Sequence, residues 1–209
     1  MNIKNNSLYL VISEEYGKDR SVLEIAEAAI KGGVDMIQMR EKDKPREELV
    51  DLGKKLSRLC KESDVIFIVD DDPVLAKEVG ADGVHLGQED LNKYSLKEAR
   101  KLLGPDRIIG ISTHSIEQFQ NAVGADADYI AFGPIFETKT KDYFLGTKDV
   151  KKIAATAAKP VFFIGGINLS NIDIILKEGA KNIALIRGVS EAEDIASATK
   201  GFKERMHTL

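Results

Sequence analysis

Eight short apolar runs alternate with longer amphipathic segments, and this alternation constrains the fold more than any other feature of the chain. The runs predict strands near residues 7–12, 35–40, 65–70, 83–86, 108–112, 128–132, 160–164 and 182–186. The intervening segments have helical spacing, as in Val22, Ile25, Ala26 and Ala29. Strands that alternate with helices are typical of a parallel sheet with helical crossovers.

Similar Gly-containing turns precede four of these runs, at residues 32–35, 80–83, 124–127 and 179–182. A Gly that follows a helix can adopt the left-handed conformation that ends it. The repeated turn therefore indicates a repeating βα unit. Eight units close most simply as a (β/α)8 barrel, and 209 residues is near the lower size for that fold. The alternative is an open doubly wound sheet, but no G-x-G-x-x-G motif follows the first run. We expect an α/β protein in which residues 1–209 form a single (β/α)8 TIM barrel of parallel strands.

Composition narrows the classes of partner. The net charge of −4 provides no basic surface for nucleic acid, although a local cluster of cations could still bind phosphate. No stretch approaches 18 apolar residues, and the N-terminal segment has no signal-peptide pattern. We expect a cytoplasmic protein without a nucleic-acid or membrane partner. The single cysteine, Cys60, lies in an apolar helical stripe, which predicts buried packing.

Barrel enzymes carry their active sites at the carboxyl ends of the strands, so the residues after each run are the candidates. After the second run, Gln38, Arg40 and Lys42 alternate and should share one face. Arg supplies paired donors and Lys a compact charge, which predicts a cradle for a diphosphate. A solvated strand end with an Arg–Glu pair is the alternative.

Acidic residues follow the third and fourth runs. Asp72 precedes Pro73, which is a good helix start, but capping does not explain Asp70 and Asp71. Mg²⁺ typically takes one or two carboxylates together with substrate phosphate oxygens. We therefore predict that Asp71 and Asp90 form a metal pair. The alternative is that each acidic cluster only caps the helix after it.

Hydroxyl, histidine and loop residues follow the fifth and sixth runs. Ser112 could bond a phosphate oxygen or a leaving group, although Ser also caps helices. His85 and His114 are acid–base candidates, for which a structural role is the more usual reading. Residues 133–142 could close over phosphates as a lid, or remain a flexible solvated loop.

The loops after the last two runs predict a second anion site. Barrels of this kind often bind phosphate there with a short helix N-terminus, and Gly allows the backbone to approach the anion. Gly166 and Arg187 occupy these loops. The chain is thus expected to hold a diphosphate and a monophosphate on opposite sides of one barrel mouth.

Taken in order, these motifs resemble the thiamine-phosphate synthase family over nearly the whole chain. The resemblance is carried by residues 38–42, 70–71, 82–90, 112–114, 133–136, 165–167 and by Thr138, Thr140 and Lys141. It implies condensation of 4-amino-2-methyl-5-hydroxymethylpyrimidine diphosphate with 4-methyl-5-(2-phosphoethyl)thiazole, or its carboxylated form, by Mg-assisted dissociative substitution. The products would be thiamine phosphate and pyrophosphate.

The resemblance also implies roles for individual residues. The pyrimidine diphosphate would be bound by Gln38, Met39, Arg40, Glu41, Lys42, Asp70, Ser112 and Lys141. Ser112 and Lys141 would be the catalytic residues that contact the departing diphosphate. The thiazole phosphate would be bound by Thr138, Lys139, Thr140, Gly166, Ile186 and Arg187. One Mg²⁺ ion would be held by Asp71 and Asp90.

Two positions depart from the family pattern. Asp70 stands where Asn is usual, so its charge would be neutralised by Mg²⁺ or join the metal shell. Arg187 stands where Ser is usual. Its side chain could strengthen the phosphate site, or it could point outward while the backbone N–H binds, which is the interpretation we favour.

Other functions remain open at this point. A thiazole tautomerase of similar sequence would have no use for a metal pair or a diphosphate cradle. A non-catalytic sensor would bind without turnover, and a general sugar-phosphate barrel enzyme would leave the residues after the second to fourth runs idle. The expected partners are small phosphorylated substrates, and the sequence leaves a homo-oligomer open.

Overall fold

The computed structural model describes residues 3–208, and its eight parallel strands close into a barrel in sequence order. Each strand agrees with its predicted run to within one residue at either end. The strands are Leu8–Ile12 (β1), Met36–Met39 (β2), Ile66–Asp70 (β3), Gly83–Leu86 (β4), Ile108–Thr113 (β5), Tyr129–Phe132 (β6), Val161–Ile164 (β7) and Asn182–Leu185 (β8). The single (β/α)8 architecture predicted from the alternation is therefore confirmed.

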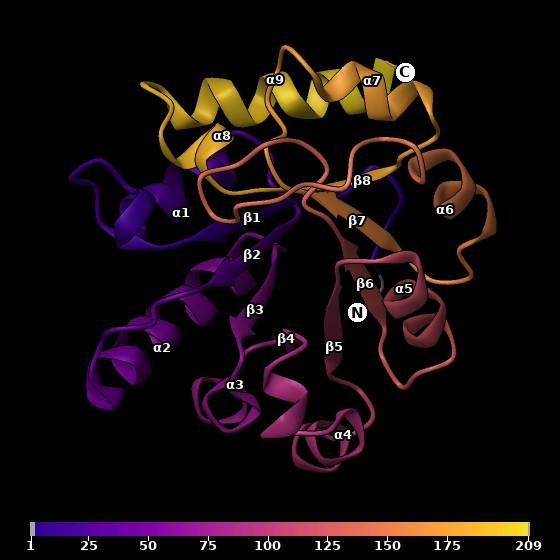
Figure 1. The fold of residues 1–209 in the computed structure, drawn as a ribbon. Coiled ribbons are helices and arrows are strands. Elements are labelled where there is room, and N and C mark those ends of the chain that lie inside the picture. The colour runs from indigo at the N-terminus through magenta and orange to yellow at the C-terminus, as the bar shows by residue number, and fades with distance from the viewer. Residues whose placement is uncertain (1–2, 209) are drawn as a thin grey trace.

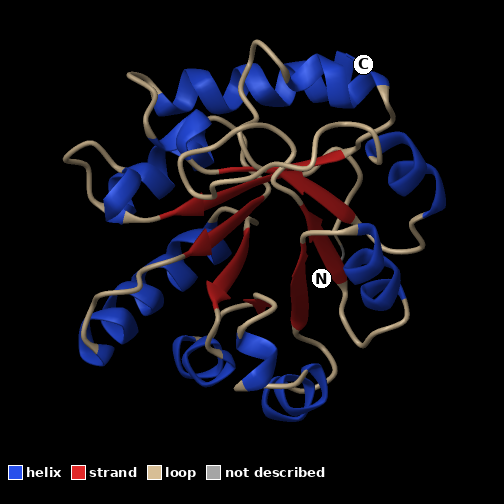
Figure 2. Ribbon diagram, in the orientation of Figure 1, coloured by secondary structure: helices blue, strands red, loops and turns tan. Residues whose placement is uncertain are grey.

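Helices surround the strands on the outside of the barrel (Figures 1 and 2). They are Val22–Lys31 (α1), Arg46–Glu62 (α2), Pro73–Val79 (α3), Leu96–Leu103 (α4), Ile116–Val123 (α5), Val150–Thr156 (α6), Ile172–Lys177 (α7), Arg187–Ser190 (α8) and Ile195–Thr208 (α9). Two short 3₁₀ turns, Glu14–Tyr16 (η1) and Asp90–Asn92 (η2), follow β1 and β4.

Local sequence signals explain where several helices begin and end. Ser21 with Glu24 forms a capping box at the start of α1, and Asp72 accepts hydrogen bonds from two backbone N–H groups of α3. The capping role predicted for Asp72 is thus confirmed. Gly80 ends α3 in the left-handed conformation with φ of 72°. Gly124 differs, because it follows α5 in the right-handed helical region with φ of −84°.

Two apolar cores follow from the two faces of each strand. One set of side chains packs between the strands and the helices, and the other fills the inside of the barrel. The inner cluster consists of Tyr9, Met36, Ile68, Ile108, Tyr129, Phe162 and Ala184. Because inward positions recur every second residue, the next inward positions toward the carboxyl ends include Gln38, Asp70, His85 and Ser112.

The first and last units of the barrel lock together. β1 pairs with β8, and Lys203 of α9 contacts the Asp35 carboxylate at 2.6 Å. Cys60 of α2 is fully buried, and burial raises the pKa of its thiol to about 12. The buried packing predicted for this cysteine is confirmed.

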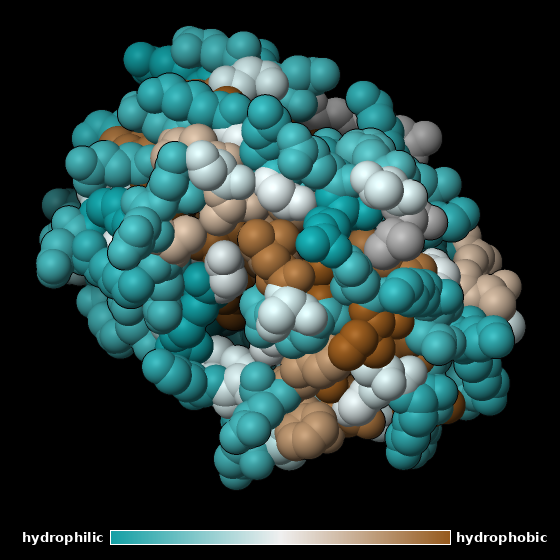
Figure 3. Space-filling view, turned by 90° about the horizontal axis from the view of Figure 1, so that it is seen from above, coloured by the Kyte–Doolittle hydropathy of each residue, from teal (hydrophilic) through white to brown (hydrophobic). Residues whose placement is uncertain are grey.

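Seen from above relative to Figure 1, the molecule is mostly hydrophilic, with a hydrophobic area beside a hollow (Figure 3). Within residues 3–208, no helix has the length and apolar character needed to cross a membrane.

Candidate functional site

Cations and carboxylates gather where β2 and β3 end. The Gln38 side chain is buried, and its Nε2 donates a hydrogen bond to Asp70 Oδ1. Arg40 Nε lies 3.4 Å from Asp70 Oδ2, and Lys42 Nζ lies 3.9 Å from Asp71 Oδ2. The three residues predicted as a cradle therefore lie at the mouth together. The carboxylates of Asp70 and Asp71 neutralise part of the positive charge of Arg40 and Lys42.

Asp70 sits at the centre of this group. Burial raises the pKa of its carboxyl to about 6, while the nearby Arg40 and Lys42 charges oppose the shift. Its two oxygens accept from the Gln38 amide and face the Arg40 guanidinium. The carboxylate that departs from the family pattern thus works here as a fixed acceptor between two neighbouring side chains.

Asp71 and Asp90 are brought side by side, as predicted. Burial raises the pKa of Asp71 to about 8, and the Asp70 and Asp90 carboxyls add to the shift. Asp71 adopts φ of 61°, and its backbone N–H donates to the His85 carbonyl at 2.8 Å. Asp90 Oδ2 accepts from the Gly87 N–H at 3.0 Å. The backbone therefore holds both carboxyls in place at the rim.

Such crowding fits a divalent cation. Carboxyls that repel one another gain most from a positive charge between them, and Mg²⁺ needs only one or two protein carboxylates. Residues 3–208 contain no group of three or more His, Cys, Asp or Glu side chains arranged to hold a metal by themselves. The donor set at Asp71 and Asp90 consequently suits an ion that completes its shell with substrate oxygens.

Two residues of the predicted diphosphate set have their side chains engaged elsewhere. Met39 belongs to the core between strands and helices. Glu41 Oε1 accepts a hydrogen bond from the Glu14 N–H at 2.6 Å, which ties the loop after β2 to η1. Both line the same cavity as Lys42 and Asp71. They shape the wall of the cavity more than they offer groups to a ligand.

Ser112 at the end of β5 is joined to a buried histidine. Its Oγ lies 2.8 Å from His85 Nε2, and His85 Nδ1 lies 2.9 Å from the Tyr129 hydroxyl. Burial lowers the pKa of His85 to about 4, so its imidazole is neutral at neutral pH. His114 Nδ1 donates to the Gly133 carbonyl at 2.6 Å, which is a structural contact.

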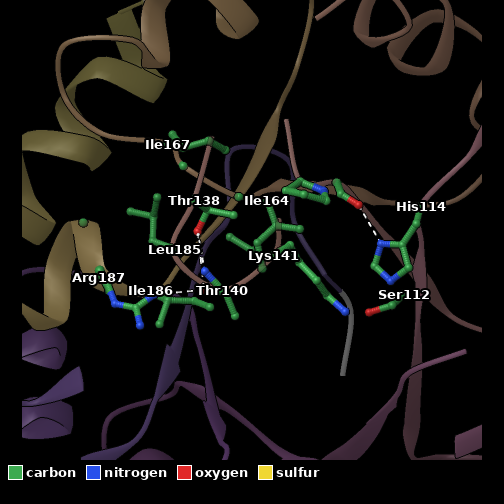
Figure 4. A pocket seen from close by; sticks show the side chains of 16 residues that line it. Ser112, His114, Thr138, Thr140, Lys141, Ile164, Ile167, Leu185, Ile186 and Arg187 are labelled. Atoms are coloured by element: carbon green, nitrogen blue, oxygen red, sulfur yellow. Dashed lines mark hydrogen bonds between the residues drawn. The ribbon is translucent and has the colours of Figure 1, made fainter. Parts of the chain in front are cut away.

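A second pocket opens at the ends of β5 to β8 (Figure 4). It is lined by Ser112, His114, Gly133, Pro134, Thr138, Thr140, Lys141, residues 164–167 and residues 184–188. Figure 4 shows Lys141 directed to the side of the pocket where Ser112 and His114 lie, with Arg187 on the other side. Every residue predicted for the thiazole phosphate lines it except Lys139, which is exposed outside it.

Glycine is required in one wall of this pocket. Gly166 has φ of 65°, and a Cβ there would lie 2.3 Å from the Glu137 carbonyl oxygen. The loop after β7 and the loop after β6 can therefore touch only if position 166 lacks a side chain. After β8 the chain enters the short helix α8 at Arg187, as the prediction of a helix start in this loop required.

Arg187 reaches across the edge of the pocket. Its NH1 donates to Thr140 Oγ1 at 2.9 Å, and its Nε lies 3.0 Å from Glu191. Its guanidinium lies over the Tyr16 ring at 4.3 Å, and the Tyr16 hydroxyl accepts from Arg40 at 3.2 Å. Tyr16 thus connects the two halves of the mouth.

Sequence reasoning missed the tyrosines of the mouth and the barrel. Tyr9 and Tyr129 lie on the inner face of β1 and β6, and Tyr16 lies in η1. The available signal was a Tyr within an otherwise apolar strand, because a buried phenol needs a hydrogen-bond partner. Nothing in the local spacing identified those partners.

The sequence of this protein is similar to those of known proteins. The family model described as thiamine monophosphate synthase matches residues 8–189. A thiamine-phosphate synthase from Halalkalibacterium halodurans is 42% identical over 198 residues, which is 93% of this chain and 92% of that protein. Another from Caldicellulosiruptor saccharolyticus is 39% identical, with 94% of this chain and 89% of that protein covered.

Solved structures agree. Thiamine phosphate pyrophosphorylase from Pyrococcus furiosus superposes with a TM-score of 0.88 at 35% identity, over 97% of this chain and 96% of that one. A 3-hexulose-6-phosphate synthase superposes with a TM-score of 0.65 at 18% identity, over 95% and 99%. The second likeness concerns the fold alone.

Proposed function

The chain belongs to the thiamine monophosphate synthase family, and on this premise we propose how its barrel mouth carries out the family reaction. The protein is a transferase that forms thiamine phosphate with release of pyrophosphate. The observation that carries the proposal is that the two halves of the mouth meet. Ser112 and Lys141 line the pocket that also contains Arg187, while Ser112 contacts His85 beside the carboxylate and cation group.

The half of the mouth at β2 to β4 takes the pyrimidine diphosphate. Arg40 and Lys42 provide the charge for its phosphates, and Gln38 and Asp70 form the floor. Each cation is already paired with a carboxylate. We infer that the diphosphate displaces part of this pairing when it binds. Because the carboxylates already hold the two cations close together, less free energy is spent on ordering these side chains during binding.

Asp71 and Asp90 hold one Mg²⁺ ion in this proposal. When bound, the ion supplies positive charge that stabilises the leaving pyrophosphate. The protein contributes the fixed positions of the two carboxyls. The His85 carbonyl accepts from the Asp71 backbone N–H, and the Gly87 N–H donates to the Asp90 carboxylate.

The pocket at β5 to β8 takes the thiazole phosphate. Gly166 and the start of α8 offer backbone N–H groups to a monophosphate, and Thr138, Thr140 and Arg187 lie around them. Ile164, which packs against the inner cluster of the barrel, provides apolar contact for the thiazole ring. The wall is thus apolar at the centre and polar at the rim, as ligand pockets usually are.

The reaction is a substitution at the pyrimidine methylene carbon. The bond from this carbon to the diphosphate oxygen breaks, its electron pair leaves with pyrophosphate, and the thiazole nitrogen forms the new bond. The aminopyrimidine ring delocalises the positive charge, so the first bond can break early. Arg40, Lys42 and Lys141 act by electrostatics and positioning, and no protein nucleophile is needed.

Two other functions are less well supported. A tautomerase could use His114, which lines the second pocket, but it would leave the Asp71–Asp90 pair and the Arg40 and Lys42 cations without a role. A sensor binds its ligand without turnover. It would therefore have no use for Lys141 and Ser112, which lie together between the two proposed anion sites. We further propose that residues 1–209 form one domain in the cytoplasm that acts on small phosphorylated substrates.

The test is pyrophosphate release by the purified protein with the pyrimidine diphosphate, with and without thiazole phosphate and Mg²⁺. We expect release only with all three, together with thiamine phosphate. Saturable binding of thiazole phosphate without any release would overturn the proposal and favour the tautomerase or the sensor.

A further inference from the structure

A continuous chain of hydrogen bonds crosses the inside of the barrel. Gln38 Nε2 contacts Asp70, and the Tyr9 hydroxyl lies 2.5 Å from Gln38 Oε1. The Tyr9 and Tyr129 hydroxyls are 2.9 Å apart, and Tyr129 lies 2.9 Å from His85 Nδ1. The chain ends at Ser112, whose Oγ lies 2.8 Å from His85 Nε2.

Asp70 determines the direction of every proton in this chain. Its Oδ2 faces Arg40 and its Oδ1 faces Gln38, so it accepts at both oxygens. The Gln38 amide must then turn its NH₂ group to Asp70 and its oxygen to Tyr9, because the opposite orientation would set two oxygens against each other. Tyr9 therefore donates to Gln38.

The remaining directions follow one after another. A phenol has one proton, so Tyr9 can only accept from Tyr129, and Tyr129 can then only accept from His85 Nδ1. A neutral imidazole has one N–H, which leaves His85 Nε2 as an acceptor. Its one partner in the chain is the Ser112 hydroxyl, which consequently donates to it.

We propose that the buried chain from Gln38 to His85 is a positioning device that turns the Ser112 proton inward, so that Ser112 Oγ accepts a hydrogen bond from substrate at the barrel mouth. The exocyclic amine of the aminopyrimidine is the N–H donor that this substrate offers. Ser112 would then orient the pyrimidine, and contact with the departing diphosphate would fall to Lys141 and the cations of β2. This inference rests on the proposed function only for the identity of the substrate.

Burial prevents the chain from rearranging easily. Tyr9 and Tyr129 are at most 1% exposed, and Gln38 and His85 are 3% and 7% exposed. The Tyr129 ring packs edge-on against Phe162 and occupies the space beside Gly110, where a Cβ would lie 2.0 Å from the ring. Reversing one bond would require reversing the others, because each buried group has to keep a partner.

The direct test is the tautomer of His85, measured by ¹⁵N NMR on the protein labelled in its imidazoles. The protein contains three histidines, so the variants His114→Asn and His207→Asn assign the imidazole signals. We expect His85 protonated at Nδ1 and bare at Nε2. His114 provides an internal reference, because its Nδ1 donates to a carbonyl. A proton on His85 Nε2 would overturn the proposal.

A second arm tests Ser112 with the product. Adding pyrophosphate and Mg²⁺ should leave the His85 Nε2 shift unchanged, since Ser112 keeps donating to it. Movement of this signal toward the value of an unbonded nitrogen would mean that Ser112 has turned to the diphosphate. That outcome would also overturn the proposal.

Variants separate positioning from folding. Tyr129→Phe keeps the ring packing and removes the link that holds the His85 tautomer, so we expect kcat to fall by about tenfold with KM for the thiazole phosphate little changed. Tyr94→Phe, a matched loss of a hydroxyl outside the barrel, should leave kcat unchanged. His85→Gln offers an acceptor near the Nε2 position and should retain more turnover than His85→Leu.

The kinetic and spectroscopic experiments test the proposal independently of each other. Unaltered kcat in Tyr129→Phe would contradict the positioning role even if the tautomer is as expected. If the wild-type protein releases no pyrophosphate, the proposed function fails, while the NMR arms still decide whether the chain directs the Ser112 proton.

Discussion

Charge balance differs among the cations of the mouth. Arg40 and Lys42 each face a carboxylate, at 3.4 Å and 3.9 Å. Lys141 forms no ion pair within residues 3–208, although it lines the same pocket as Ser112. A cation without a competing carboxylate offers its full charge to an anion that develops during the reaction. We therefore assign Lys141 the largest share of the chain's own stabilisation of pyrophosphate.

Lys141→Ala should lower kcat by about 100-fold or more, because one preorganised donor to a developing anion is worth this much. The side chain is exposed, so the thermal unfolding midpoint should not change. Lys148→Ala, which removes an exposed lysine from the same loop, is the matched control. Equal turnover in the two variants would remove Lys141 from the mechanism.

His85 predicts how stability depends on pH. An unfolded histidine has a pKa near 6.5, whereas burial lowers the pKa of folded His85 to about 4. Below pH 6.5 the unfolded state binds a proton at this histidine that the folded state does not, so the contribution of His85 to folding stability should be lost as pH falls from about 6.5 to about 4. The loss from this group is on the order of 3 kcal/mol.

Urea unfolding at several pH values checks this expectation. Wild type and His85→Gln are compared, and their difference in unfolding free energy should shrink toward low pH. His207→Gln near the end of α9 is the control, because that side chain is exposed. A difference between wild type and His85→Gln that stays constant across this range would contradict the buried, neutral histidine.

Three elements that are distant in the chain meet over the second pocket. The loop after β6 contributes Thr140, α8 contributes Arg187, and η1 contributes Tyr16. The guanidinium lies between the hydroxyl and the aromatic ring, so it holds the loop against the barrel. In Figure 1 this loop crosses the mouth near β1 and β8. An Arg at position 187 thus does more than replace a small residue at a phosphate site.

Arg187→Ser tests this role with the residue usual in the family. Losing a charge-assisted contact should raise KM for the thiazole phosphate by about tenfold, and KM for the pyrimidine diphosphate should change much less. Cleavage of the loop by a protease should become faster. Arg205→Ser, which breaks the ion pair with Asp173 on the outer surface, is the control. An unchanged KM would show that the backbone alone binds the phosphate.

Closure of the barrel is a property of the whole molecule. β1 pairs with both β2 and β8, so no strand has a free edge among the described residues. α9 packs against α1, and Phe202 within it is fully buried. The mouth depends on this closure, because the residues that line its two cavities come from seven of the eight strand ends or the loops after them, and Tyr16 follows the remaining strand, β1.

Cys60 provides a reporter of global unfolding. It is the single cysteine, it lies on the buried face of α2, and a thiol with a pKa of about 12 is almost never ionised at neutral pH. We expect its labelling by a disulfide reagent to proceed only as fast as the barrel opens. The measurement compares labelling with unfolding rates by circular dichroism across urea concentrations, and labelling much faster than unfolding would contradict the expectation.

Local spacing was enough to determine the architecture and part of the site. The eight runs, the cap at Asp72 and the placement of Gln38, Arg40 and Ser112 at strand ends follow from periodicity over a few residues. Alternation along a strand decides which side chains face inward. That rule holds wherever the strand lies in the barrel, so the sequence alone could predict it.

Only the tertiary structure decided which partner each side chain takes. The Tyr9–Tyr129 contact joins residues 120 positions apart. The stacking of Arg187 on Tyr16 likewise depends on closure. Glu41 turned to the Glu14 backbone because a competing donor was within reach. Such choices depend on which distant groups closure brings within about 3 Å, and no local pattern records that distance.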